Sequence, residues 1–159
     1  MRSRKSAGRA AAVAAAVVGA AAIAQPASAQ LVFDCQIGDG GRIPTASGDQ
    51  ATFGGSASTS GVQLGHQVYV DHGPATPLRF RSLTMNAIVC DPDGRRADMA
   101  GTGTVELPSG AQQVVGYDIR VRDLGELPFS PPDTYRITLS NGYDSGEQLV
   151  RQGNIQIEF

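Results

Sequence analysis

Three short segments near the C-terminus decide the fold: YDIRVR at 117–122, TYRITLS at 134–140 and IQIEF at 155–159. In each segment an apolar residue alternates with a polar or charged one. Side chains of a β-strand point alternately to opposite faces, so this pattern predicts strands with one buried and one solvated face. One-sided burial of this kind is typical of antiparallel sheets. We therefore expect residues 110–159 to form the centre of an antiparallel β-domain.

The segment at 78–90 is the longest strand candidate in the remainder of the chain. Its apolar positions change parity, from an even number at Phe80 to odd numbers over 83–89. A strand cannot move its apolar set to the other face without an extra residue. We therefore predict a β-bulge near Arg81 and Ser82.

About eight short strands separated by turn signals predict an all-β fold with minimal helix. We expect a two-sheet antiparallel sandwich, Ig-like or jelly-roll-like, with a barrel as the alternative. Four glycines and a proline within 38–49 indicate a linker, so residues 30–50 are interpreted as an N-terminal arm and linker and 51–159 as the sandwich domain. Three prolines within 124–132 predict a connection that crosses between the sheets.

The first 29 residues have the composition of a secretory signal peptide. A basic start precedes an uncharged Ala/Val/Ile run over 10–24, and the small residues of 27–29 form a cleavage site. We expect cleavage near Ala29 and a secreted, extracellular protein. A membrane anchor is the alternative, but this run is shorter than the roughly 18 to 20 apolar residues of a spanning helix. We expect no membrane span in the mature chain.

Removal of the signal peptide would make the chain more acidic. Four of the 13 basic residues lie in it, which leaves nine against 15 acidic residues and a net charge of −6. The nine are arginines scattered along the chain, whereas nucleic-acid binding requires clustered positive charge. We expect no nucleic-acid partner. The predicted partner is an extracellular protein or a surface polymer of unknown identity.

Cys35 and Cys90 are the only cysteines. An exported chain reaches an oxidising compartment, where such a pair forms a disulfide. Closing a loop of this length stabilises the fold by roughly 4 kcal/mol in the chain-entropy model. We therefore predict a disulfide between Cys35 and Cys90 and regard a redox or metal role as the less favoured alternative.

Candidate metal ligands are sparse. On an extended strand His66 and His72 would lie roughly 20 Å apart, so they cannot share a metal ion. Asp91, Asp93 and Asp98 supply only part of a calcium-binding loop, because the remaining alternating oxygens and the terminal Glu are missing. We expect both histidines to lie at the surface and the three aspartates to belong to a solvated turn.

Further carboxylates fall at the ends of predicted strands, where they either converge on a cation or cap turns: Asp71, Asp123, Glu126 and Asp133. The serines in turn-like contexts lack the G-x-S-x-G context of a hydrolase nucleophile: Ser56, Ser58, Ser60 and Ser109. We therefore assign no catalytic, cofactor-binding or metal-binding residue and expect no cofactor. Two alternatives stay open: a small secreted hydrolase using Asp123, Asp133 or His66, and a calcium-stabilised adhesin-like domain.

A set of short motifs from about residue 51 onward resembles a known family. They are Phe53-Gly54-Gly55, Gly65-His66, Tyr69-Val70-Asp71-His72, Gly101-Thr102-Gly103, Tyr117 with Asp123 and Gly125-Glu126, Asp133-Thr134-Tyr135-Arg136-Ile137 and Gly153-Asn154-Ile155-Gln156-Ile157. This segment resembles post-COAP domains, the small domains that follow choice-of-anchor domains in secreted bacterial proteins. The resemblance implies an extracellular all-β module without assigned catalytic residues. We accordingly expect a non-catalytic structural or binding module.

Overall fold

The computed structural model describes residues 34–60, 64–74, 77–125, 128 and 130–159, so the predicted signal peptide and Glu126 lie outside the described residues. Nine strands and no helix occur in the described part. The strands are β1 (Gln36–Pro44), β2 (Gln50–Ser58), β3 (Gly65–Asp71), β4 (Leu78–Cys90), β5 (Arg96–Glu106), β6 (Gln112–Arg122), β7 (Thr134–Leu139), β8 (Gln148–Leu149) and β9 (Gln152–Glu158). These strands belong to one compact unit. A search of the described residues for an apolar helix of bilayer-spanning length finds none.

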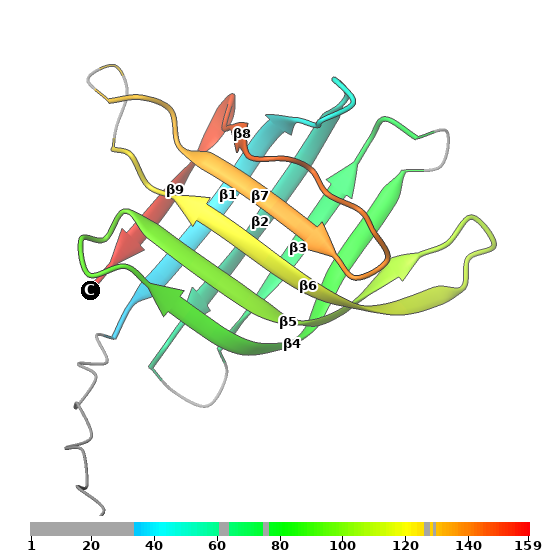
Figure 1. The fold of residues 1–159 in the computed structure, drawn as a ribbon, viewed down its shortest axis with the longest axis horizontal. Coiled ribbons are helices and arrows are strands. Elements are labelled where there is room, and N and C mark those ends of the chain that lie inside the picture. Colours follow the sequence, from blue (N-terminus) through cyan, green and yellow to red (C-terminus); the bar gives the residue numbers. More distant parts are fainter. Residues whose placement is uncertain (1–33, 61–63, 75–76, 126–127, 129) are drawn as a thin grey trace, which may run out of the picture. The chain divides into compact units, whose positions relative to one another are not determined.

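All nine strands belong to one antiparallel sheet in the order β8-β7-β6-β5-β4-β3-β2-β1-β9. From β1 to β8 each strand pairs with the next one in the chain, and β9 then pairs with β1. The sheet curls into a half-barrel (Figure 1). The predicted all-β antiparallel fold is confirmed. The two-sheet sandwich of about eight strands is not confirmed, because the described strands form a single sheet of nine.

The core lies between two halves of this one curved sheet. The ring of Tyr135 on β7 stacks on Phe53 of β2 at 4.0 Å between centroids and on Tyr69 of β3 at 6.1 Å. Tyr69 and Tyr135 are fully buried. Strands far apart in the sheet therefore share one core. Curvature performs the role that a second sheet has in a sandwich, because both bury the apolar faces of alternating strands.

Two irregularities in β4 accompany this curvature. Its pairing with β5 shifts between Ser82 and Thr84 and again between Met85 and Ala87. The predicted bulge near Arg81 and Ser82 is confirmed. The second shift was not predicted, and it reverses the parity again, so Val89 is 60% exposed where the alternation predicted an inward side chain. Bulges bend a strand and increase its local twist, which favours a curled sheet.

The linker interpretation of 38–49 is wrong over its first seven residues. They belong to β1, which pairs along its length with β2 and β9 (Figure 1). Glycines weaken an isolated strand, but here both neighbours supply backbone hydrogen bonds. At Gly41 a side chain is excluded, because an added Cβ would overlap the Gln152 carbonyl oxygen of β9. The predicted crossing at 124–132 is also wrong, since this segment connects the neighbouring strands β6 and β7.

The predicted disulfide is confirmed. Cys35 lies directly before β1 and Cys90 is the last residue of β4, and their Cα atoms are 6.6 Å apart. The bridge joins strands that are separated by β2 and β3 in the sheet. It therefore holds the curved sheet together at one end.

Candidate functional site

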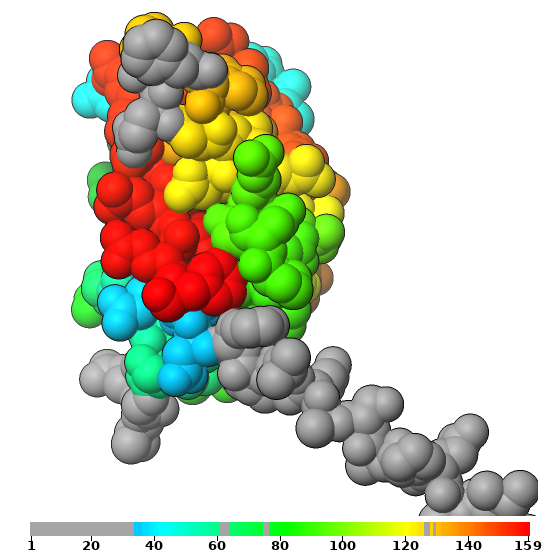
Figure 2. Space-filling view, turned by 90° about the vertical axis from the view of Figure 1, so that its left-hand side faces the viewer, coloured from blue at the N-terminus to red at the C-terminus, as the bar shows by residue number. Residues whose placement is uncertain are grey.

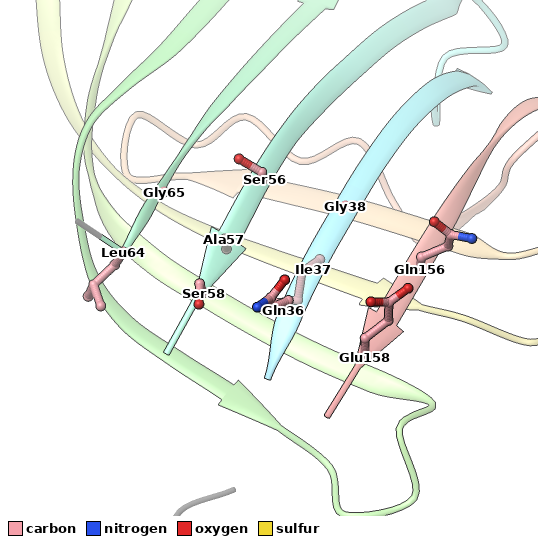
Figure 3. Close-up of a pocket in the computed structure, with 10 residues that line it drawn as sticks. All are labelled: Gln36, Ile37, Gly38, Ser56, Ala57, Ser58, Leu64, Gly65, Gln156 and Glu158. Carbon is pink, nitrogen blue, oxygen red and sulfur yellow. The ribbon is translucent and has the colours of Figure 1, made fainter. Parts of the chain in front are cut away.

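A shallow groove of about 420 Å³ lies on the face of the sheet away from the core. It crosses neighbouring ends of β9, β1 and β2 and reaches the start of β3 (Figure 3). The lining residues are Gln36, Ile37, Gly38, Ser56, Ala57, Ser58, Leu64, Gly65, Gln156 and Glu158. In the described part of the chain, this groove is the best candidate for a ligand site.

Strand alternation places the polar lining residues on one face. Ile37, Ala57 and Ile157 are buried against the core, so their immediate strand neighbours point outward. The even-numbered residues of β1, β2 and β9 accordingly line the groove, as the sticks for Gln36 and Gln156 show (Figure 3). Three chain segments distant in sequence thus bring their polar side chains to one surface.

The floor of the groove includes bare backbone. An added Cβ at Gly38 would meet no other atom within 4 Å, and its φ is not in the left-handed region. Neither packing nor backbone conformation therefore requires glycine there. The same holds for Gly40 and Gly54 on the adjoining outer surface, where added Cβ atoms would make only ordinary contacts. A flat ligand can approach the main chain closely at such positions.

The chemistry of the groove is that of neutral hydrogen bonding. Within the described residues, the side chains of Gln36, Gln156 and Glu158 make no hydrogen bond or ion pair with the protein. Ser58 Oγ lies 2.8 Å from Ser60 Oγ, and either hydroxyl can donate. Among the described residues, the lining contains one carboxylate, no Arg or Lys and no aromatic ring. The groove therefore suits a ligand rich in hydroxyl or amide groups rather than an anionic one.

A second hollow of about 450 Å³ lies on the outer face over β4 to β7. Most of its charged side chains already have partners: Arg120 Nε donates to Asp98 Oδ1 at 2.8 Å and Arg136 Nη2 to Asp144 Oδ2 at 2.6 Å. Among the described residues, only the exposed Asp118 carboxylate of this lining has none. The hydrogen bond to Asp144 and the charge of that carboxylate raise the pKa of Arg136, and the same hydrogen bond lowers the pKa of Asp144. This hollow offers fewer free groups than the groove.

Ser56 at the groove faces His66 across the β2–β3 pair. Its Oγ lies 3.5 Å from His66 Nδ1, which is at the limit of a hydrogen bond. No carboxylate of the described residues hydrogen-bonds to the imidazole, so the third member of a hydrolytic triad is not found there. His72 is also exposed, and its Nε2 lies 3.1 Å from Thr52 Oγ1.

Asp123 and Asp133, the acidic hydrolase candidates, occupy another part of the fold. Asp133 is 5% exposed, and its oxygens accept the amides of Leu124 and Ile155, each at 2.9 Å. Asp123 accepts the amides of Gly125 and Ile157, each at 3.1 Å. These carboxylates fasten the free edge of β9 to the β6–β7 connection. The structure does not bring them together with His66 of β3.

Two of the three aspartates near the β4–β5 turn also bind the protein itself, whereas the Asp91 side chain makes no hydrogen bond or ion pair among the described residues. Asp98 forms ion pairs with Arg96 and Arg120 at 2.6 and 2.8 Å. Asp93 accepts the amide of Arg95 in the β4–β5 turn. In the described part of the chain, no three His, Cys, Asp or Glu side chains gather closely enough to hold a metal ion.

Asp71 belongs to a buried hydrogen-bond chain. It accepts the Tyr143 hydroxyl at 2.8 Å, and this hydroxyl lies 2.6 Å from that of Tyr69. Burial and these two partners raise the pKa of Tyr143 well above its usual value, and burial raises the pKa of Tyr69 to about 12. Tyr143 is half-buried and anchors the β7–β8 connection to β3.

One interior carboxylate was not singled out from the sequence. Asp39 of β1 accepts Gln67 Nε2 at 2.9 Å, and burial raises the pKa of Asp39 to about 6. Its Oδ1, the Gln67 Oε1 and the Tyr135 hydroxyl are buried without a hydrogen-bond partner among the described residues. The interpretation of β1 as part of an arm and linker concealed Asp39 and the three residues that β1 contributes to the groove. Alternation of Ile37 with Gln36 and Gly38 was the available signal.

Comparisons of the chain with protein-family models, curated proteins and solved structures find no match.

Proposed function

We propose that this chain is a secreted, non-catalytic binding module that presents the groove between β9, β1 and β2 to a neutral surface polymer rich in hydroxyl groups. The observation that carries the proposal is the combination of a bare floor at Gly38 with polar side chains that have no partner in the described protein. Because the described lining has no aromatic ring, the proposed ligand is held by hydrogen bonds rather than by stacking.

Three further observations support this function. The disulfide fits an oxidising extracellular compartment, and the leader-like composition of residues 1–29 fits export. The resemblance of residues 51–159 to post-COAP domains also favours an extracellular non-catalytic module. A site of this size that lacks stacking binds weakly, with an expected dissociation constant on the order of 1 mM per site.

The test is co-sedimentation of the purified protein with insoluble cellulose, chitin and bacterial cell-wall polysaccharide. We expect retention on at least one polymer and its loss in Gly38→Leu, which fills the groove where the structure has room for a side chain. Gln36→Ala with Gln156→Ala should reduce retention at least tenfold. Gln50→Ala, which changes an exposed glutamine outside the groove lining, is the matched control and should retain full binding.

The proposal fails if none of the three polymers retains the wild-type protein, or if Gly38→Leu binds as well as wild type. Circular dichroism of each variant establishes that its β-structure is intact. Release of soluble sugar from any of these polymers, abolished by His66→Ala, would instead support the hydrolase alternative.

A further inference from the structure

The strand β6 is longer than the strand that covers it. Its pairing with β7 spans Tyr117 to Arg122, whereas its pairing with β5 continues to Gln112. The hairpin of β5 and β6 therefore extends beyond the end of β7 (Figure 1). Within the described chain no strand pairs with residues 112–115 on the side away from β5. We call this segment the open edge.

The direction of the free backbone groups follows from Gly116. Its N–H donates to Ser140 Oγ at 2.9 Å and its carbonyl accepts the amide of Ser140 at 3.0 Å, so both point away from β5. Backbone groups alternate in direction along a strand. The N–H and C=O of Gln112 and Val114 therefore also point away from β5, and both residues are exposed, Val114 by 68%.

The open edge lacks the usual protection against pairing. Natural edge strands commonly carry Lys, Pro or inward-pointing charge, but residues 107–117 contain no charged residue and the only proline, Pro108, lies in the turn. The chain as a whole is acidic, so two copies repel each other over most surfaces. A charge-free edge avoids that repulsion and is compatible with a second copy of itself.

We propose that the open edge pairs with the open edge of a second copy, antiparallel about a two-fold axis at Gln113. In this register Gln112 of each copy lies opposite Val114 of the other, and all four free backbone groups of each chain form hydrogen bonds. The two Gln113 residues face each other as a non-hydrogen-bonded pair, with Cα atoms about 4.5 Å apart. The β5–β6 hairpins of two molecules then form one continuous sheet.

The contact is small, so the dimer is weak and depends on concentration. Interfaces well below about 1,000 Å² are characteristic of transient association. We expect a dissociation constant on the order of 100 µM to 1 mM. A dimer of this kind brings two copies of the proposed groove into one particle, which would increase retention on a polymer that carries repeated sites. The pairing itself does not rest on the proposed ligand.

A covalent trap tests the register. Gln113→Cys places two thiols on the axis within the Cα separation that a disulfide needs, so mild oxidation should yield a disulfide-linked dimer on a non-reducing gel. Gln112→Cys is the matched control, because its two Cα atoms would be about 8 Å apart, too far for a bridge. Peptide mapping establishes that Cys35 and Cys90 remain paired. Equal cross-linking of both variants, or none of Gln113→Cys, contradicts the proposal.

Sedimentation equilibrium tests the pairing without a new cysteine. The mass of the wild-type protein should increase between about 10 µM and 1 mM, and that of Val114→Pro should not. Proline at 114 removes an N–H that points away from β5, so the β5–β6 pairing is retained. Val114→Thr keeps the amide and should associate like wild type. A wild-type protein that is monomeric at 1 mM, or a Val114→Pro variant that still associates, would overturn the inference.

Discussion

The free edge of β9 and the open edge of β6 are both margins of the same sheet, but the protein completes only one of them. At β9, Asp133 and Asp123 accept the amides of Ile155 and Ile157. At β6, no described strand or side chain meets the backbone groups of Gln112 and Val114. In this protein the backbone amides at a sheet margin are therefore paired only where side-chain carboxylates of a facing segment reach them.

The completed margin is also tightly packed. Val150 donates its amide to the Asp133 carbonyl, and Arg151 donates to that of Arg42, so residues 150–151 join β1 to the start of β7. Figure 2 shows the C-terminal strand in red directly beside the residues around the end of β6 in yellow and the β4–β5 turn in green. An added Cβ at Gly94 of that turn would lie 3.1 Å from the Phe159 ring. Backbone hydrogen bonds, side-chain carboxylates and close packing therefore all hold the margin at β9 in place.

The largest predicted effect concerns the disulfide, which joins the end of β4 to the start of β1, the strand that pairs with β9. Replacing both Cys35 and Cys90 by Ala should lower the free energy of unfolding by about 4 kcal/mol, because the unfolded chain is released from a closed loop. Urea denaturation of the double variant measures this change. A loss below about 1 kcal/mol would show that curvature is held without the bridge.

Next in size is the carboxylate that fastens β9. Asp133→Ala should cost about 3 kcal/mol, because two buried amides, those of Leu124 and Ile155, lose their acceptor. Asp93→Ala is the control, since the Arg95 amide that it leaves is exposed, and it should cost less than about 1 kcal/mol. Equal losses in chemical denaturation would show that the two amides bound by Asp133 contribute no more stability than one exposed turn amide.

Asp39 lies on β1, the strand that pairs with β9. Its substitution tests whether burial of a carboxylate is enough to stabilise the fold. Its pKa in the folded state is about 6, above the usual 3.8, so its contribution is fully present below pH 3.8 and is lost as the pH rises through 6. Asp39→Asn can pair reciprocally with the Gln67 amide. At pH 8 it should raise the free energy of unfolding by about 2 kcal/mol. The gain should disappear near pH 3.5, and a gain independent of pH would contradict this assignment.

The smallest effect is predicted at the open edge. Val114→Lys should change the free energy of unfolding by less than about 0.5 kcal/mol, because Val114 is exposed and does not belong to the hydrophobic core. The same change at the completed margin, Ile155→Lys, buries an unpaired charge and should prevent stable folding. Thermal unfolding of both variants compares the margins directly. A loss above about 1.5 kcal/mol in Val114→Lys would mean that the edge is not open.

Prediction from the sequence succeeded where the pattern is local. The alternation around Ile119 and Ile137 identified strands and inward faces, and the two cysteines with a leader-like start indicated their disulfide. It failed at β1, because glycines at 38, 40 and 41 are a loop signal unless neighbouring strands supply the missing stability. The groove was missed for the same reason, since its floor belongs to β1.

By itself, the sequence determined an all-β chain with alternating strands and one disulfide, because side-chain periodicity and cysteine number are local properties. Only the tertiary structure decided that one sheet curls upon itself, that Asp123 and Asp133 bind amides of β9, and that part of β6 stays uncovered. These features depend on which distant strands become neighbours. That choice is made by the packing of Phe53, Tyr69 and Tyr135 across the core, which no pattern along the chain encodes.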